Sequence, residues 1–301
     1  MQRRHKRLYG AAAIAGTLLG GLTAGPVIAA FAAPAWSTFV CHGTFHKPGH
    51  LTGRHWSVIV RGTCVVDRGP ALVQGNILIR KHSNLIAAFG RHHSRLIVKR
   101  NIFVERGATL ILGCEAKHSP CLDDPHPKKP SRNSRSIVFG SIFGNRALGI
   151  VVHNSVIGRN VIQAGGGGGT TCRPHGVFRH LKSPVFSDYE DSFVHGTLVV
   201  RKLRSCWLGV IRNLVVGSVV VSRNRMADHD ANEVVTNVVL RNLVCFRNHP
   251  RVQFGDSHGK PNKVSRHALF ECSFRRLVPS PAGQHKHFEH ISVRLRRHHH
   301  R

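Results

Sequence analysis

GTLVVRKLRSCWLGVIRNLVVGSVVV, residues 196–221, contains one short pattern twice. A pair of small residues, Gly196-Thr197 and then Gly217-Ser218, comes directly before a run of aliphatic residues. The second pair begins 21 residues after the first (217 minus 196). Short runs dense in Val, Ile and Leu that are bounded by turn-forming residues are typical of β-strands. The stretch therefore predicts short strands that recur at a regular interval.

The same pattern occurs elsewhere in the chain. Turn pairs precede aliphatic runs at Gly75-Asn76, Arg100-Asn101, Arg159-Asn160 and Arg241-Asn242. Unbroken steps are 25 residues from 75 to 100 and 24 residues from 217 to 241. Periods of about 20 to 50 residues indicate solenoids, but the leucine-rich frame is missing and a propeller blade needs about 40 residues. Each period therefore fits one coil of a parallel β-helix with coils ~4.8 Å apart, and we expect the Asn of these pairs to stack as a ladder.

We predict an all-β domain, a parallel β-helix over residues 36–275. An antiparallel β-sandwich also uses many short strands and is the alternative. Polar segments rich in Pro or Gly interrupt the pattern, so we expect irregular loops at about 115–135 and 165–190. The five glycines that open the second loop lack the Gly-Lys-Ser/Thr of a phosphate-binding loop and favour a flexible insertion. Residues 276–301 are expected to form a basic, partly disordered tail.

Residues 1–35 have the pattern of an export signal. Four basic residues lie among the first seven, and residues 8–41 contain no Asp, Glu, Lys or Arg. Ala33-Pro34-Ala35 offers a small-residue cleavage site after the expected signal helix. Cleavage there predicts a secreted, extracellular or cell-surface protein. An uncleaved segment acting as a membrane anchor is the alternative, although its Gly and Pro residues weaken a spanning helix.

All eight cysteines follow this signal. An even number of cysteines in an exported chain favours disulfides, although eight allow 105 connectivities. Pairing of neighbours in the sequence predicts the bonds Cys41–Cys64, Cys114–Cys121, Cys172–Cys206 and Cys245–Cys272. Buried free thiols are the alternative. Zinc is disfavoured, because there is no C-x-x-C and no matching spacing of Cys and His.

The charge of the chain is strongly positive, with 44 Lys and Arg against 14 Asp and Glu and a formal net charge of +30. Such a balance predicts attraction to polyanions such as anionic polysaccharide, teichoic acid, anionic lipid or nucleic acid. No specific nucleic-acid-binding motif accompanies it. A genome-wide bias toward Arg, His, Gly and Ala codons would also give this composition.

Four segments carry a family resemblance: SCWLGVIRN (205–213), MADHDANEVVTN (226–237), VQFGDS (252–257) and ECSF (271–274). In this order they resemble a group of exported actinobacterial proteins of uncharacterised function. The resemblance implies a right-handed parallel β-helix, the architecture of pectate lyases, and no assigned reaction. That family has Gly-Gly-Asn at its turns where this chain has Arg100, Arg159 and Arg241. If the turn requires a positive φ, each Arg costs about 1 kcal/mol, which predicts a diverged or even decayed member.

The acidic residues gather at a few places in the chain. They form one group at Asp188, Glu190 and Asp191, a second at Asp228 and Asp230, and a later residue, Asp256. With one coil per period, two coils place the first two groups roughly 10 Å apart if they share a face. That separation is near the ~6.5–9.5 Å between the carboxyl groups of inverting glycosidases. We therefore treat these six residues as candidate catalytic acids; a lyase would instead use an Arg base, with Arg212 and Arg241 as candidates.

The second acidic group also resembles the start of a calcium loop. Asp228, Asp230 and Asn232 alternate as such ligands do, but Glu233 stands where an EF-hand requires Gly. An EF-hand is therefore excluded, while a looser calcium site made of these four residues remains a candidate. The alternative is structural, because Asp and Asn cap turns and acids pair with the abundant Arg.

Three functional hypotheses follow from these patterns. The first is a non-enzymatic extracellular or cell-envelope protein that binds anionic polymer, with no resident cofactor. The second is a polysaccharide lyase or glycoside hydrolase that uses the clustered carboxylates, with calcium in the lyase case. The third is a purely structural or decayed protein.

Overall fold

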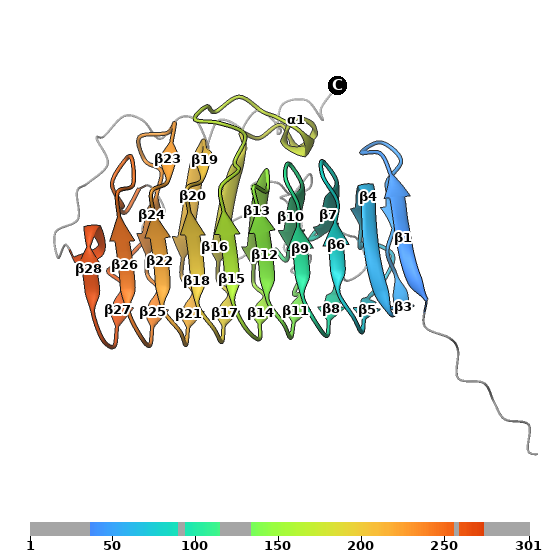
Figure 1. Ribbon diagram of the computed structural model, residues 1–301, viewed down its shortest axis with the longest axis horizontal. Helices are drawn as coiled ribbons and strands as arrows, with labels where there is room; N and C mark the ends of the chain where they lie inside the picture. The colour runs from blue at the N-terminus through green and yellow to red at the C-terminus, as the bar shows by residue number, and fades with distance from the viewer. Residues whose placement is uncertain (1–36, 90–93, 115–133, 256–258, 274–301) are drawn as a thin grey trace, which may run out of the picture. The chain divides into compact units, whose positions relative to one another are not determined.

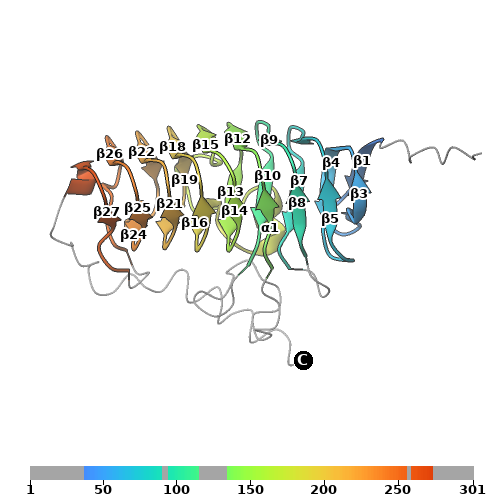
Figure 2. The same ribbon diagram turned by 90° about the horizontal axis from the view of Figure 1, so that it is seen from below.

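The computed structural model describes residues 37–89, 94–114, 134–255 and 259–273, and these residues form a parallel β-solenoid (Figure 1). Its coils follow one another in chain order from β1 to β28. A typical coil places one short strand on each of three faces, and each strand pairs in parallel with its counterparts in neighbouring coils (Figure 2). The predicted all-β parallel solenoid is confirmed, and the parallel pairing argues against an antiparallel sandwich.

The strands of the first face are β1 (Thr38–Gly43), β6 (Ile77–Ile79), β9 (Ile102–Val104), β12 (Ile142–Asn145), β15 (Val161–Ala164), β18 (Leu198–Arg201), β22 (Val219–Ser222), β26 (Leu243–Phe246) and β28 (Ala268–Phe270). Those of the second face are β2 (Gly49–His50), β7 (Asn84–Ala87), β10 (Thr109–Leu112), β13 (Gly149–His153), β16 (Phe186–Glu190), β20 (Trp207–Ile211) and β24 (Glu233–Val235). The longer strand β4 (Ser57–Val65) joins the two faces, because its first half pairs with β6 and its second half with β7.

The third face consists of β3 (Gly53–His55), β5 (Ala71–Val73), β8 (Leu96–Val98), β11 (Ile137–Val138), β14 (Val156–Ile157), β17 (Phe193–Val194), β21 (Leu214–Val215), β25 (Val238–Val239) and β27 (Lys263–Val264). A short extra pair, β19 (Arg204–Ser205) and β23 (Arg225–Met226), lies between the first and second faces. The helices among the described residues are α1 (Val177–Leu181) and the 3-10 turn η2 (Glu271–Ser273). None of the described helices is long and apolar enough to cross a membrane.

The register of the first face reproduces the predicted period. Ile77 pairs with Ile102, Leu198 with Val219, and Val219 with Leu243, which are steps of 25, 21 and 24 residues. Inward residues of these strands are fully buried and stack as aliphatic columns, while their neighbours along each strand are partly exposed. The interior is therefore the dry, stacked core that the alternating pattern predicts.

The predicted ladder at the turn pair is present in a mixed form. Asn76 Oδ1 accepts a hydrogen bond from the backbone N–H of Asn101 at 3.0 Å, and Asn101 Oδ1 accepts one from Ser141 at 2.9 Å. Asn160 Oδ1 accepts from the N–H of Thr197 at 2.8 Å. Hydroxyl residues thus share the ladder with Asn, because any side-chain oxygen at this corner can accept from the next coil.

The expectation of strain at the Arg-substituted turns is wrong. Arg100, Arg159 and Arg241 do not have positive φ, so their backbone conformation does not require glycine. Positive φ occurs instead at the corner between the first and second faces, where Arg146 and Lys202 have φ values of 54° and 55°. The Arg residues of the turn pair are therefore no evidence of decay.

The loop predicted over 165–190 is only partly irregular. Residues 186–190 form β16, a central strand of the second face that pairs with both β13 and β20. The glycine run is not a flexible insertion, because Gly167 N–H bonds the carbonyl of Ala147 at 2.9 Å and the N–H of Arg204 bonds the carbonyl of Gly166 at 3.0 Å. Glycine is required there, since φ at Gly167 is 92° and a Cβ would collide with the carbonyl of Arg204.

Disulfides fix three parts of the solenoid. The predicted bonds Cys41–Cys64, Cys172–Cys206 and Cys245–Cys272 are present. The fourth predicted bond includes Cys121, which lies outside the described residues, as do the predicted signal at 1–35, most of the loop at 115–135, and the tail at 276–301. The Cys172–Cys206 bond attaches the insertion that precedes β16 to the coil that follows it.

Candidate functional site

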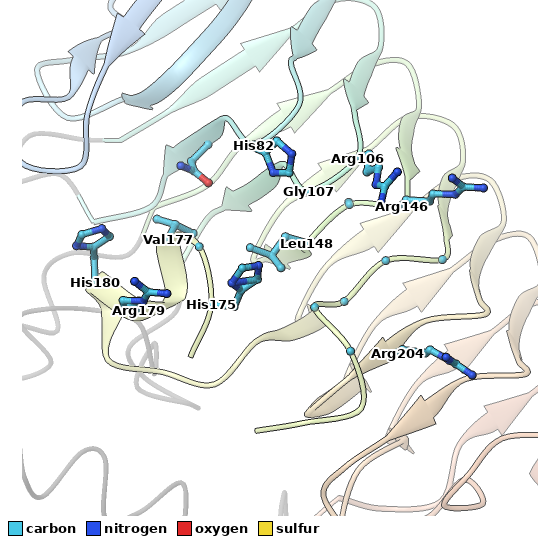
Figure 3. A pocket seen from close by; sticks show the side chains of 18 of the residues that line it. His82, Arg106, Gly107, Arg146, Leu148, His175, Val177, Arg179, His180 and Arg204 are labelled. Atoms are coloured by element: carbon cyan, nitrogen blue, oxygen red, sulfur yellow. The ribbon is translucent and has the colours of Figure 1, made fainter. Parts of the chain in front are cut away.

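A cavity of about 990 Å³ lies where the insertion before β16 meets the turns between the first and second faces (Figure 3). One side of the cavity is formed by α1 and the residues just before it, and the other by the corner turns of successive coils. The glycine run Gly165–Gly169 also lines the cavity. Ligand sites typically occupy about 300–1,000 Å³, so this cavity is large enough for an extended ligand.

The lining of this cavity is cationic. Its ionisable side chains are all basic: His82, Arg106, Arg146, His175, Arg179, His180 and Arg204. Among the residues that the structure describes, no Asp or Glu lines it. Within the part of the chain that the structure describes, none of the four arginines forms an ion pair. A cleft with walls of one sign focuses its field and concentrates ligands of the opposite charge.

Local packing explains why α1 presents its basic residues to the cavity. Val177 and Phe178 are buried, and Phe178 packs edge-on against Phe186 of β16 at 5.4 Å between ring centroids. The apolar side of this short helix is thereby held against the second face, and Arg179 is left exposed. The ring of His180 stacks on Phe45 at 4.4 Å, which links the helix to the first coils.

The cationic lining continues along the solenoid as a ridge. We define the corner ridge as the exposed basic residues at the turns between the first and second faces: Arg80, Lys81, His82, Arg106, Arg146, Arg201, Lys202, Arg204, Arg223, Arg225, Arg247 and His249. Successive coils repeat at ~4.8 Å, so the ridge presents cations at close and regular intervals. Acids at these turns are few, and Glu105 is already paired with Arg80 at 3.1 Å.

A second cluster, of opposite character, lies farther along the strands of the second face. His153 Nε2 lies 2.8 Å from Asp188 Oδ2 and 3.7 Å from Glu190 Oε2. Arg212 bonds Asp191 through Nε at 2.7 Å and Nη2 at 2.8 Å, and its Nη2 also bonds Glu190. The pairing of His153 with Glu190 and of Val151 with Asp188 in the register of β13 and β16 explains why these groups meet.

Burial dominates the electrostatics of this acidic cluster. Asp188 is 3% exposed and Glu190 is 4% exposed. Burial raises the pKa of Glu190 to about 8, and the neighbouring carboxylate of Asp188 adds to the rise, against the opposing charges of His153 and Arg212. Burial likewise raises the pKa of Tyr189, which points into the solenoid and donates to Gln163 Oε1 at 2.7 Å.

The predicted acids separate into different environments. Asp228 and Asp230 precede β24 and form a turn, because the N–H of Asp230 donates to Asp228 Oδ1 at 3.1 Å. Asp228 also lies beside the Cys172–Cys206 disulfide. Asp256 lies outside the described residues.

The remaining candidates have structural partners of their own. Asn232 Nδ2 donates to the carbonyl of Pro250 at 2.7 Å, and buried Glu233 accepts from Trp207 Nε1 at 2.9 Å. Glu233 shares a face with the first acidic group. Asp188 pairs with Gly209 and Gly209 pairs with Glu233, so Glu233 lies two coils beyond Asp188 in the same outward column. Of the two Arg candidates, Arg212 is held by Asp191 and Glu190, while Arg241 is exposed at the turn pair.

Two features escaped the sequence analysis. His153 could not be matched to Asp188, because the insertion before β16 lengthens that coil and hides the register. The corner ridge did leave a signal: Lys202, Arg223 and Arg247 each stand four residues after the start of β18, β22 and β26. Comparison of the chain with protein-family models, with curated proteins and with solved structures finds no match to any of them.

Proposed function

We propose that the protein is an exported, non-enzymatic protein of the extracellular space or cell envelope that binds a linear anionic polymer. Anionic polysaccharides and teichoic acids are the classes in view, and the proposed architecture is a right-handed β-helix. The observation that carries the proposal is the cavity whose described lining has seven basic side chains and no acid. The net charge of +30 supplies long-range attraction.

The corner ridge supports a polymer rather than a small anion as the ligand. Its cations repeat along the solenoid axis, and a chain with regularly spaced negative groups can contact several of them at once. Arginine suits this role, because its planar guanidinium binds phosphate, sulfate or carboxylate through two hydrogen bonds. Arg106, Arg146 and Arg204 belong to both the ridge and the cavity, so the cavity is the place where a bound chain meets the highest density of cations.

The hydrolase or lyase alternative is less well supported. A polymer-cleaving enzyme needs carboxylates that reach the substrate, whereas Asp188, Glu190 and Glu233 are at most 4% exposed. Asp228 and Asp230 have an evident role in their own turn. Incubation with the polymer should therefore leave its chain length unchanged, with or without calcium.

The test compares two triple variants of equal charge. Arg106→Gln/Arg179→Gln/Arg204→Gln removes three exposed cations from the cavity, and Arg100→Gln/Arg159→Gln/Arg241→Gln removes three exposed cations from the turn pairs. The binding constants for heparin and for poly(glycerol phosphate) are measured between about 50 and 200 mM salt. The logarithm of the binding constant is plotted against the logarithm of the salt concentration, because each phosphate or sulfate contact adds just under one to the magnitude of this slope. The cavity variant should lower the magnitude of that slope by roughly two to three and weaken binding at least about tenfold.

The control determines where binding occurs. If the polymer contacts the cavity, the turn-pair variant should keep most of the wild-type affinity and slope. Equal losses in the two variants would assign binding to net charge alone. Binding by the wild type that is absent or insensitive to salt would remove the proposal.

A further inference from the structure

We propose that His153, Asp188 and Glu190 bind one divalent transition-metal ion that links strands β13 and β16. The three side chains each offer one ligand atom, and these atoms lie within 4.8 Å of one another. This site differs in position and chemistry from the calcium candidate at 228–233, and it does not depend on the polymer-binding proposal.

The distances suit a small ion. His153 Nε2 lies 2.8 Å from Asp188 Oδ2 and 3.7 Å from Glu190 Oε2. A zinc ion binds imidazole nitrogen at about 2.0–2.1 Å and carboxylate oxygen at about 2.0–2.2 Å, so ligand atoms around one ion are separated by roughly 3 Å. Small side-chain rotations would bring these atoms to that spacing without a change in the strand register.

An unsatisfied buried oxygen points to a missing ligand. Asp188 is 3% exposed, and its Oδ1 accepts no hydrogen bond within the part of the chain that the structure describes. This oxygen lies over Gly209 of the next coil, and a Cβ at that position would collide with it. A buried carboxylate oxygen without a donor is costly, and an ion bound to both oxygens of this carboxylate would satisfy it.

The charges around the site also favour a cation. Asp188, Glu190 and Asp191 bring three carboxylates into one buried region, and Arg212 is the guanidinium that pairs with two of them. Arg212 donates a hydrogen bond to Glu190 and is itself held by two hydrogen bonds to Asp191, as outer groups orient the ligands around bound metals. A set of one imidazole and two carboxylates selects ions such as Zn²⁺, Co²⁺ or Mn²⁺, whereas Ca²⁺ prefers oxygen ligands alone.

The experiment uses the full chain after treatment with EDTA. Co²⁺ is titrated as the probe, and the readouts are its visible absorption band, the metal content after gel filtration, and the midpoint of thermal unfolding. His153→Gln and Asp188→Asn remove one ligand each. Asp228→Asn is the matched control, since it removes a carboxylate from the other acidic group. The 24 histidines of the chain add weak background binding that is nearly the same in every protein.

We expect one tight equivalent of Co²⁺ in the wild type and in Asp228→Asn, displaced by Zn²⁺ and not by Ca²⁺, with a rise in the unfolding midpoint. Affinity should fall at least about tenfold in His153→Gln and Asp188→Asn. The inference is overturned if the wild type shows only background binding, or if a folded His153→Gln protein retains the tight equivalent. If both variants fail to fold, the wild-type titration alone still decides, because a chain without the site gives no tight equivalent and no rise in the midpoint.

Discussion

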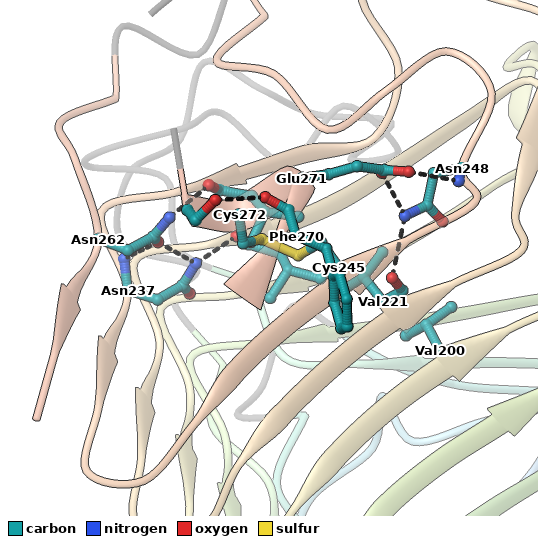
Figure 4. Close-up of a disulfide and its surroundings, with 12 residues drawn as sticks. Val200, Val221, Asn237, Cys245, Asn248, Asn262, Phe270, Glu271 and Cys272 are labelled. Atoms are coloured by element: carbon teal, nitrogen blue, oxygen red, sulfur yellow. Dashed lines mark hydrogen bonds between the residues drawn. A yellow bond between two sulfur atoms is a disulfide. The ribbon is translucent and has the colours of Figure 1, made fainter. Parts of the chain in front are cut away.

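Replacement of Asn237 by Ala tests whether buried Asn ladders stabilise this solenoid (Figure 4). Asn237 is fully buried at the corner between the second and third faces. Its Oδ1 accepts from the N–H of Asn213 at 2.9 Å, and its Nδ2 donates to the carbonyl of Val210 at 2.6 Å and to Asn262 Oδ1 at 2.9 Å. The side chain therefore connects three successive coils.

The expected loss in the free energy of unfolding follows from the groups that Ala leaves without these partners. The N–H of Asn213 and the carbonyl of Val210 are both buried, and each unsatisfied group costs about 1–3 kcal/mol. We expect a loss of about 3 kcal/mol in total. Asn160→Ala is the matched control, because Asn160 is only half-buried and water can replace its bond to Thr197, so its loss should be about 1 kcal/mol.

The assay is urea unfolding with the disulfides intact, followed by tryptophan fluorescence and by far-ultraviolet circular dichroism. Coincident transitions are needed before the midpoints are converted to free energies, because stacked repeats do not always unfold in one step. A loss below about 1 kcal/mol for Asn237→Ala, or an equal loss for Asn160→Ala, would refute the reasoning that buried amides, rather than corner amides in general, hold the coils together.

Two further predictions concern the insertion and the acidic cluster. Gly167→Ala should destabilise the protein more than Gly169→Ala, because both residues have positive φ but only a Cβ at Gly167 collides with backbone. Equal unfolding midpoints for the two variants would instead support the prediction that the glycine run is a flexible insertion. Arg212→Gln should lower the free energy of unfolding by about 3 kcal/mol, since it leaves buried Glu190 and partly buried Asp191 without their guanidinium partner. The exposed pair of Arg80 with Glu105 is its control, and Arg80→Gln should cost at most about 1 kcal/mol in the same urea assay; similar losses for the two variants would contradict the assigned burial.

The coil was predictable because the sequence repeats the features that build it. Most turn pairs carry a side-chain oxygen that bonds the next coil, and the following strands alternate buried with partly exposed residues. Both requirements are local, so they leave a periodic record in the chain. Cys41 and Cys64, and likewise Cys245 and Cys272, lie about one coil apart and meet for the same reason, whereas the Cys172–Cys206 bond joins the insertion to a coil and has no periodic origin.

The second face was harder to predict because its strands are buried on both sides. In β16 the inward residues Ser187 and Tyr189 are polar, and so are the outward residues Asp188 and Glu190, yet all four are buried. A polar strand without alternation has the sequence pattern of a loop, and the glycine run before it strengthened that interpretation. Only tertiary contacts, such as the bond from Gln163 Nε2 to Ser187 Oγ at 3.0 Å, make this strand favourable.

The direction of the strands places the two proposed sites at opposite ends of the second face. These strands run away from the corner ridge, so Phe186 and Trp207 lie at the ends nearer the ridge, while Glu190 and Ile211 lie at the far ends. Phe178 of α1 covers Phe186, which in turn contacts Trp207 at 6.1 Å between ring centroids. This aromatic row lies at the start of β16 and β20, before Asp188 and Glu190 in β16. The polymer site that we propose therefore lies at the corner, and the metal site that we propose lies toward the opposite end of the same strands, so the two would bind opposite charges at separate places.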